Sequence, residues 1–345
     1  ASGSEESRKP HQSHTTAHVN QVADEEGDLR SRGGEHLKTT IVSLTEDTVR
    51  FLIEGVDTAF MNALRRTMVS EVPTMTIEDI FYFDNSSLVP DEILANRIGF
   101  TPLKTDLDSY VLPEECDCEA ELGCPKCRAV LTMDVESTGD TITVYSGDLV
   151  PDDPNTAPAS DKIVLAKLAE GQAIRFEAYA QLGQGKVHAK WTPTSMCVYQ
   201  NVSIVPITDK VQAEDCVGDC GDAAVIEGDN LKIIDIQKFD SCKRCRELVP
   251  HEQILENLKE DEFLFTVEST GALPPQRIVT DAVKVLKKKL ATLSEKVEKD
   301  ELHDEISDFE VPEVDEGKLY SVGSGDFDED EESGEDDGFT GGIDE

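Results

Sequence analysis

Two amphipathic segments near opposite ends of the chain dominate the pattern of hydrophobic positions. In the first, Phe60, Leu64 and Met68 recur at i, i+4 and i+8 and so share one helix face. This helix should end before Pro73, because proline disfavours helical backbone at the preceding residue. The second segment, residues 275–299, predicts a long helix with a single apolar stripe. The stripe consists of Ile278, Ala282, Val285, Leu286, Leu290, Leu293 and Val297.

Most of the other apolar segments predict β-strands. Residues 38–54 are rich in β-branched and aromatic side chains on both sides of a turn at 45–47, which predicts two strands before the first helix. A short helix is expected from Asp91 to Gly99, where a carboxylate in the first turn suits the helix dipole. Further strands are expected at 76–80, 129–135, 141–145, 163–168, 173–180, 199–207 and 263–269. The pattern indicates an α+β protein.

The charge balance is strongly acidic. The 345 residues carry a net charge of −40, and residues 298–345 account for −19 of it, so the preceding 297 residues still carry −21. A body this acidic argues against direct nucleic-acid binding, which needs a basic surface. It suits the salt-rich cytoplasm of a halophilic archaeon, where screening weakens self-repulsion, although an ordinary acidic protein with an acidic tail remains an alternative. The tail also suggests a chaperone of basic proteins, a class that does not explain the ordered motifs of the middle.

The two ends of the chain have polar compositions. Residues 1–36 are expected to be a disordered leader and residues 300–345 a disordered acidic tail. The mean hydropathy is −0.37, no apolar run reaches membrane-spanning length, and the start has no apolar core like that of a signal peptide. We therefore expect a cytoplasmic protein without membrane contact.

Cysteines form the first candidate metal site. Cys116, Cys118, Cys124 and Cys127 follow the spacing C-x-C-x5-C-x2-C, which can close a tetrahedral set of four thiolates of the kind that binds Zn²⁺. Four protein ligands leave no open position for catalysis, so the site would be structural. The alternative is four reduced thiols, or thiols oxidised during purification.

A second cysteine set flanks a predicted hairpin at residues 223–236. Cys216 and Cys220 precede the hairpin, and Cys242 and Cys245 follow it. In a cytosolic protein such pairs indicate metal or redox chemistry rather than structural disulfides. An iron–sulfur redox enzyme or electron carrier is therefore the main rival class.

Catalytic motifs are not expected elsewhere. His188 and Lys190 lie beside Trp191, the only tryptophan, but no nucleophile or oriented carboxylate accompanies them. We expect a loop anchored by a packed tryptophan.

Three motifs carry a family resemblance. The first is Asn62-Ala63-Leu64-Arg65-Arg66 with the Val72-Pro73 pair and the strand at 76–80, and the second is the run from Asp91 to Leu103. The third is Glu268-Ser269-Thr270-Gly271 followed by prolines and the long helix. In this order the motifs resemble the alpha-like family of cellular RNA polymerase subunits: the bacterial alpha N-terminal domain, the archaeal D subunits and the eukaryotic third-largest subunit. The resemblance runs from about residue 37 to 299 and points to the archaeal D type.

The resemblance implies a domain plan. Residues 37–80 and 250–299, with some strand from 180–208, would form an alpha-like dimerisation domain with an antiparallel sheet and two long helices. A mostly β insert domain at 81–207 would carry the loop of four cysteines, which holds zinc in the eukaryotic relatives. Residues 208–249 would be a small ferredoxin-like hairpin bearing the second cysteine set.

The second cysteine set departs from the ferredoxin pattern that some archaeal D subunits carry. That pattern needs C-x2-C-x2-C and a further Cys-Pro. Here Leu248 takes the third position after Cys242 and Cys245, and Gly221 follows Cys220. A zinc site, an atypical iron–sulfur cluster and an empty remnant all remain possible.

The resemblance also implies a function in assembly. The chain would pair with the small alpha-like subunit L, and the pair would be the platform for the two largest subunits with subunits N and P. Arg65 and Arg66 would contact a large subunit. Nucleotidyl transfer would need the Mg²⁺ carboxylates of a large subunit, and this chain has no such cluster. The expected dimer interface is Phe60, Leu64, Met68, Ile278, Ala282, Val285, Leu286, Leu290 and Leu293.

Overall fold

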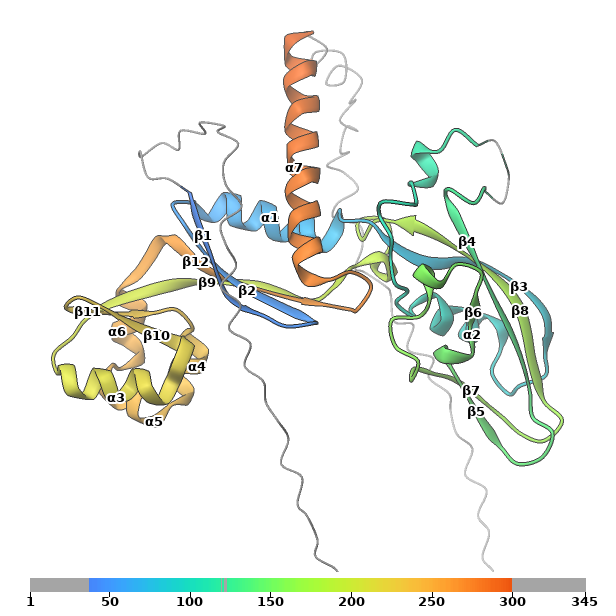
Figure 1. Ribbon diagram of the computed structural model, residues 1–345, viewed down its shortest axis with the longest axis horizontal. Coiled ribbons are helices and arrows are strands. Elements are labelled where there is room, and N and C mark those ends of the chain that lie inside the picture. The colour runs from blue at the N-terminus through green and yellow to red at the C-terminus, as the bar shows by residue number, and fades with distance from the viewer. Residues whose placement is uncertain (1–36, 119, 121–122, 300–345) are drawn as a thin grey trace, which may run out of the picture. The chain divides into compact units, whose positions relative to one another are not determined.

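The computed structural model describes residues 37–118, 120 and 123–299 (Figure 1). Helices and antiparallel sheets both contribute to it, which confirms the predicted α+β class. The predicted leader and acidic tail lie outside the described residues. By its contacts the chain divides into two compact units, Ala1–Lys288 and Lys289–Glu345, and the last helix runs across the division.

A six-stranded antiparallel sheet combines strands from both ends of the described chain (Figure 1). In pairing order the strands are β1 (Lys38–Leu44), β2 (Thr48–Glu54), β12 (Leu258–Ser269), β9 (Thr194–Pro206), β11 (Asn230–Ile233) and β10 (Ala224–Glu227). The register pairs Phe51 of β2 with Phe265 of β12, and the two rings stack with centroids 5.3 Å apart. The strand β12, which comes late in the sequence, thus pairs between β2 and β9, which come much earlier.

One face of this sheet is covered by α1 (Thr58–Ser70) and by the first turns of α7 (Pro275–Glu298). The Asp57 carboxylate caps α1 by accepting a hydrogen bond from the Phe60 N–H at 2.8 Å. The buried stripe of α1 is Met61, Leu64 and Met68, whereas Phe60 is 41% exposed. Around the helix axis Phe60 lies to one side of Leu64 and Met61 to the other, about 100° apart, and the sheet covers Met61.

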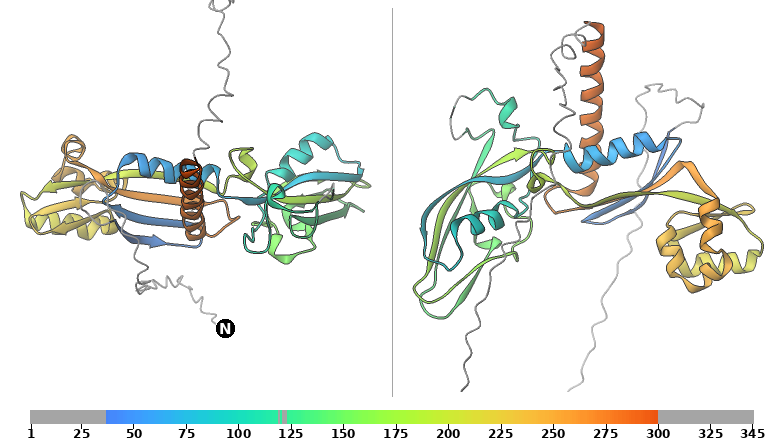
Figure 2. Two further views of the ribbon diagram at one scale, coloured as in Figure 1. Left: turned by 90° about the horizontal axis from the view of Figure 1, so that it is seen from above. Right: turned by 180° about the vertical axis from the view of Figure 1, so that it is seen from behind.

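A second, four-stranded sheet forms a separate layer with its own core. Its order is β3 (Thr74–Asn85), β8 (Ala173–Gly183), β4 (Arg128–Glu136) and β6 (Val150–Pro151). The pair β5 (Ile142–Tyr145) and β7 (Val164–Leu168), together with α2 (Asp91–Gly99), packs against it (Figure 2). Central members of this core include Met75, Ile77, Leu94, Ile98, Leu131, Leu165, Ile174 and Phe176.

The second cysteine set lies in a helical module around the β10–β11 hairpin. Its helices are α3 (Lys210–Cys220), α4 (Ile236–Ser241), α5 (Lys243–Leu248) and α6 (His251–Glu256). The sequence pattern predicts the hairpin but none of these helices, because each helix is short and α3 has little amphipathic character. Short 3-10 turns complete the described structure: η1 (Pro113–Glu115), η2 (Ser146–Asp148), η3 (Pro154–Thr156), η4 (Ala189–Trp191) and η5 (Gly221–Ala223).

Among the described residues, no helix combines the length and the apolar character needed to span a membrane.

Candidate interaction and metal sites

The apolar stripe of α7 has two different environments along its length. Ile278 and Ala282 are fully buried in the core beneath the six-stranded sheet, and Leu286 packs half-buried against the same core. Beyond this point the stripe continues on the same helix side, but Leu290 and Leu293 are 65% and 49% exposed. Val297 is also exposed. The second half of α7 therefore presents apolar side chains that nothing among the described residues buries.

The expected dimer residues consequently fall into two groups. Leu64, Met68, Ile278 and Ala282 lie in the core of this chain, where a partner could reach them only after the fold opened. The residues with accessible surface are Phe60, Val285, Leu286, Leu290 and Leu293.

Arg65 and Arg66 leave α1 in different states. The Nε and Nη2 atoms of Arg65 donate to Oδ1 of Asn62 at 3.3 and 3.0 Å, so this guanidinium is held in place one turn along the helix. Arg66 is exposed, and no partner for its side chain lies among the described residues. The orientation of the Arg65 side chain is thus fixed by Asn62, whereas no such restraint on the Arg66 guanidinium lies in the part of the chain that the structure describes.

The four cysteines of the first set converge in the loop before β4. The Sγ–Sγ distances are 3.7 Å for Cys116 and Cys124, 3.6 Å for Cys118 and Cys127, and 3.8 Å for Cys124 and Cys127. Sulfurs bound to one Zn²⁺ at about 2.3 Å in a tetrahedron would lie about 3.8 Å apart. The donor set and its spacing therefore fit a structural zinc ion.

Local backbone features of this loop favour the arrangement. Gly123 has a φ of +78°, and a Cβ atom there would lie 2.8 Å from the Arg128 side chain and 3.0 Å from Cys127 Sγ. The Lys126 backbone N–H donates to Cys124 and lowers the pKa of that thiol to about 7, whereas burial raises the pKa of Cys127. Because metals bind thiolates, the lowered pKa of Cys124 suits metal binding.

The second set brings together three of its four cysteines. The sulfurs of Cys216, Cys220 and Cys245 all lie within 4.8 Å of one another, and all three residues are buried in the module core. Cys216 and Cys245 form a disulfide, with Cα atoms 5.0 Å apart. Cys242 is half-buried and lies outside this group. With two sulfurs bonded to each other, this set does not supply the four thiolates of a ferredoxin cluster.

The His188 loop is a packing element. His188 Nδ1 accepts a hydrogen bond from the Lys190 N–H at 3.1 Å. The Lys190 ammonium pairs with the Glu78 carboxylate and lies 4.5 Å from the ring centre of Trp191. Trp191 is buried against Gly183, where a Cβ would collide with the indole.

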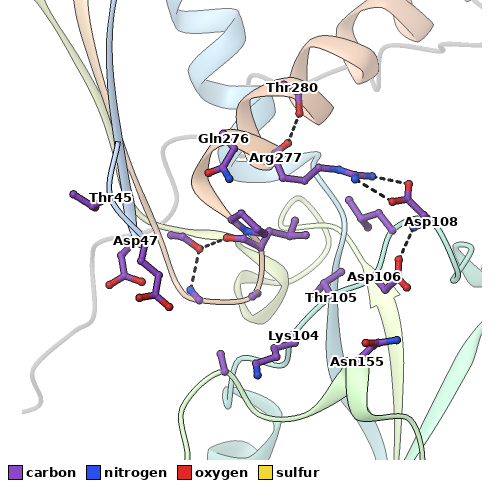
Figure 3. Close-up of a pocket in the computed structure, with 18 of the residues that line it drawn as sticks. Thr45, Asp47, Lys104, Thr105, Asp106, Asp108, Asn155, Gln276, Arg277 and Thr280 are labelled. Carbon is purple, nitrogen blue, oxygen red and sulfur yellow. Dashed lines mark hydrogen bonds and ion pairs between the residues drawn. The ribbon is translucent and has the colours of Figure 1, made fainter. Parts of the chain in front are cut away.

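One cavity was not anticipated from the sequence (Figure 3). It measures about 960 Å³ and is lined by the β1–β2 turn, the loop after α2, residues 154–159 and the start of α7. Arg277 donates to both carboxylate oxygens of Asp108 at 2.8 and 3.0 Å and also pairs with Asp281. These hydrogen bonds lower the pKa of Asp108. The lining includes no histidine or cysteine, and Arg277 is already paired with the carboxylates of Asp108 and Asp281.

This architecture, with strands from both chain ends in one sheet and an apolar helix stripe left accessible, has a counterpart among known families. The sequence profile of the RNA polymerase Rpb3/Rpb11 dimerisation domain matches residues 50–290. The chain belongs to this family.

Individual relatives are similar over most of this chain and carry the name DNA-directed RNA polymerase subunit Rpo3. The protein from Methanosphaera stadtmanae is 39% identical over 246 residues, which are 69% of this chain and 90% of that protein. The one from Methanosarcina acetivorans is 34% identical, covering 73% of this chain and 95% of that protein. The one from Pyrococcus horikoshii is 35% identical with the same two coverages.

Proposed function

We propose that this chain is a non-catalytic assembly subunit of DNA-directed RNA polymerase. It pairs with the small alpha-like subunit L, and the pair is the platform on which the two largest subunits and subunits N and P assemble. The observation that carries the pairing is the accessible half of the α7 stripe, with Leu290 and Leu293 exposed on a helix whose other half is a core element. Family membership and the names of the relatives support the polymerase assignment.

A helix from the partner would bury this stripe. Obligate interfaces of this type bury more than about 2,000 Å² and resemble a domain core divided between two chains. Leu290 and Leu293 extend the apolar surface that Ile278 and Ala282 begin, so the partner would continue the core of this chain.

The iron–sulfur redox class receives less support. In the second cysteine set only three sulfurs cluster, and two of these, those of Cys216 and Cys245, are joined in a disulfide. The relatives described above carry the names of polymerase subunits. The four-cysteine loop at residues 116–127 is better suited to one structural zinc, which would cross-link the loop before β4 and take no part in chemistry. We assign the protein to the cytoplasm, and its acidic body to a halophilic archaeal source.

The pairing is tested by replacing exposed stripe residues. L290D/L293D should abolish co-elution with subunit L while the chain alone keeps its circular dichroism spectrum, because neither side chain contributes to its own core. The matched control is A291D/T292D, which places two aspartates on the opposite, exposed side of α7. Loss of pairing in the control, or normal pairing of L290D/L293D, would contradict the proposed interface.

The arginines are tested separately, after pairing. R65A/R66A should preserve the pair with subunit L and weaken docking of a large subunit about tenfold or more. R65K/R66K should not restore docking, since lysine lacks the planar fork that binds carboxylates through two hydrogen bonds. Docking of R65A/R66A at wild-type strength in high salt would mean that both arginines are only solvated charges.

A further inference from the structure

The helix α7 is basic in an otherwise acidic chain. Residues 275–299 contain seven lysines or arginines and three acidic residues, whereas the whole chain has 32 basic and 72 acidic residues. The proposed assembly role explains the apolar stripe of this helix. It does not explain why basic residues are concentrated there.

The basic residues in the second half of α7 lie next to the exposed apolar stripe. Leu293 and Lys296 are four and seven residues after Lys289, so the three side chains lie on one side of the helix. Leu290 and Val297 continue the same surface and are exposed. This surface, which we call the terminal α7 face (Lys289, Leu290, Leu293, Lys296 and Val297), fits an occupant that is both apolar and acidic.

The sequence that directly follows α7 has this composition. Residues 300–316 contain nine acidic residues and no lysine or arginine. Among them, Leu302, Ile306 and Phe309 recur at i, i+4 and i+7, the spacing of a single helix face. We propose that residues 300–316 dock on the terminal α7 face of the same chain and cover it until a partner subunit replaces them.

The tether makes even weak docking effective. A segment joined to its binding surface by a short connection has an effective concentration of about 1 mM. If the Kd between separate molecules is about 0.1 mM, docked chains outnumber open chains by about tenfold. The partner must then bind the open fraction, and its apparent affinity falls by about the same factor. The apolar contacts would protect exposed leucines of the unpaired chain from self-association. This competition rests on the proposed pairing through α7, whereas the docking itself does not.

The docking is tested by hydrogen exchange of the amides at residues 289–298 in three proteins. These are the full chain, a chain that ends at Lys299, and a full-length L302S/I306S/F309S variant that keeps every acidic residue. Exchange should be about tenfold faster in the second and third proteins than in the first. The full-length variant separates loss of docking from fraying of a newly created chain end. Equal exchange in the full chain and the full-length variant would overturn the proposal.

A peptide of residues 300–316 gives the second measurement. Added to the chain that ends at Lys299, it should restore slow exchange. A peptide with the three apolar residues replaced by serine, and one with Asp304, Glu305 and Asp308 replaced by Asn, Gln and Asn, should each bind at least fivefold more weakly. Unchanged affinity of either altered peptide would overturn the combined apolar and acidic recognition.

Titration with subunit L separates this inference from the proposed function. The shortened chain should bind subunit L about tenfold more tightly than the full chain. Pairing without any effect of the tail would refute the competition and leave the assembly role intact. Protection of α7 by the tail without pairing in any variant would refute the assembly interface and leave the docking intact.

Discussion

The two cysteine sets differ in what holds their sulfurs together. Cys116, Cys118 and Cys124 are only half-buried, in a loop whose 3-10 turn contains no buried residue. Cys216 and Cys245, by contrast, belong to a continuous hydrophobic core formed by α3 to α6 and the β10–β11 hairpin. Removing a metal from the loop would leave little else to close it, whereas packing maintains the module. The first set would thus need a metal to hold its loop together, whereas the second set lies in a module that its own hydrophobic core holds together.

The largest expected effect is loss of metal from the loop. C124S should reduce the zinc content from one ion per chain to nearly none and expose residues 113–127 to protease, because a structural zinc in a small site contributes about 10–16 kcal/mol of folding free energy. C197S is the control and should keep its zinc, since Cys197 is a buried thiol whose pKa is raised to about 12 by burial. Elemental analysis and limited proteolysis measure both. If wild-type protein contained no metal and the loop thiols were free, the proposed difference between a metal-held loop and a core-held module would be wrong.

An intermediate effect is expected in the module. C216A/C245A should lower the free energy of unfolding by about 2–4 kcal/mol, since the disulfide closes a loop over a sequence separation of 29 residues. C242A, which removes a half-buried thiol outside the group, should change it by less than about 0.5 kcal/mol. Urea denaturation measures both variants. Three or four irons with matching sulfide in anaerobically purified protein would instead show that the module holds a cluster.

The smallest expected effect is a loss of stability of the module at low pH. Lys232 of β11 lies 2.8 Å from Glu54 and 2.7 Å from Glu262, which links the module strand to β2 and β12. Hydrogen bonds from Lys232 and then Lys38 lower the pKa of Glu54 below its usual 4.5. The stability from this pair is therefore complete above pH 4.5 and is lost as the pH falls below it. The loop should release zinc at a higher pH, because its thiolates take up protons first.

This difference is measured by following zinc release and the NMR signals of residues 210–256 during acid titration. K232M should shift the loosening of the module to higher pH and leave zinc release unchanged. The exposed pair of Lys210 and Asp229 provides the control, and K210M should alter neither transition. If zinc release and module loosening coincided in every variant, the two sets would not be independent.

The features that could be predicted from the sequence are those that depend on the spacing of nearby residues. The α+β class, the two long helices and the convergence of Cys116 to Cys127 follow from periodicity and short intervals, because each depends on neighbours within about a dozen residues. The long-range pairing of Cys216 with Cys245 and the cavity beside Arg277 depend on segments far apart in the chain. Neither leaves a local signal.

Periodicity along the chain is enough to assign side chains to each helix face, as the stripe from Ile278 to Val297 illustrates. How far the core of this chain extends along that face depends on which elements pack against the helix. Met61 rather than Phe60 faces the sheet, and α7 is buried at Ile278 and Ala282 but exposed at Leu290. Periodicity records a preference for burial, but the sheet beneath the helix has a finite area and covers only the part of the helix that it reaches.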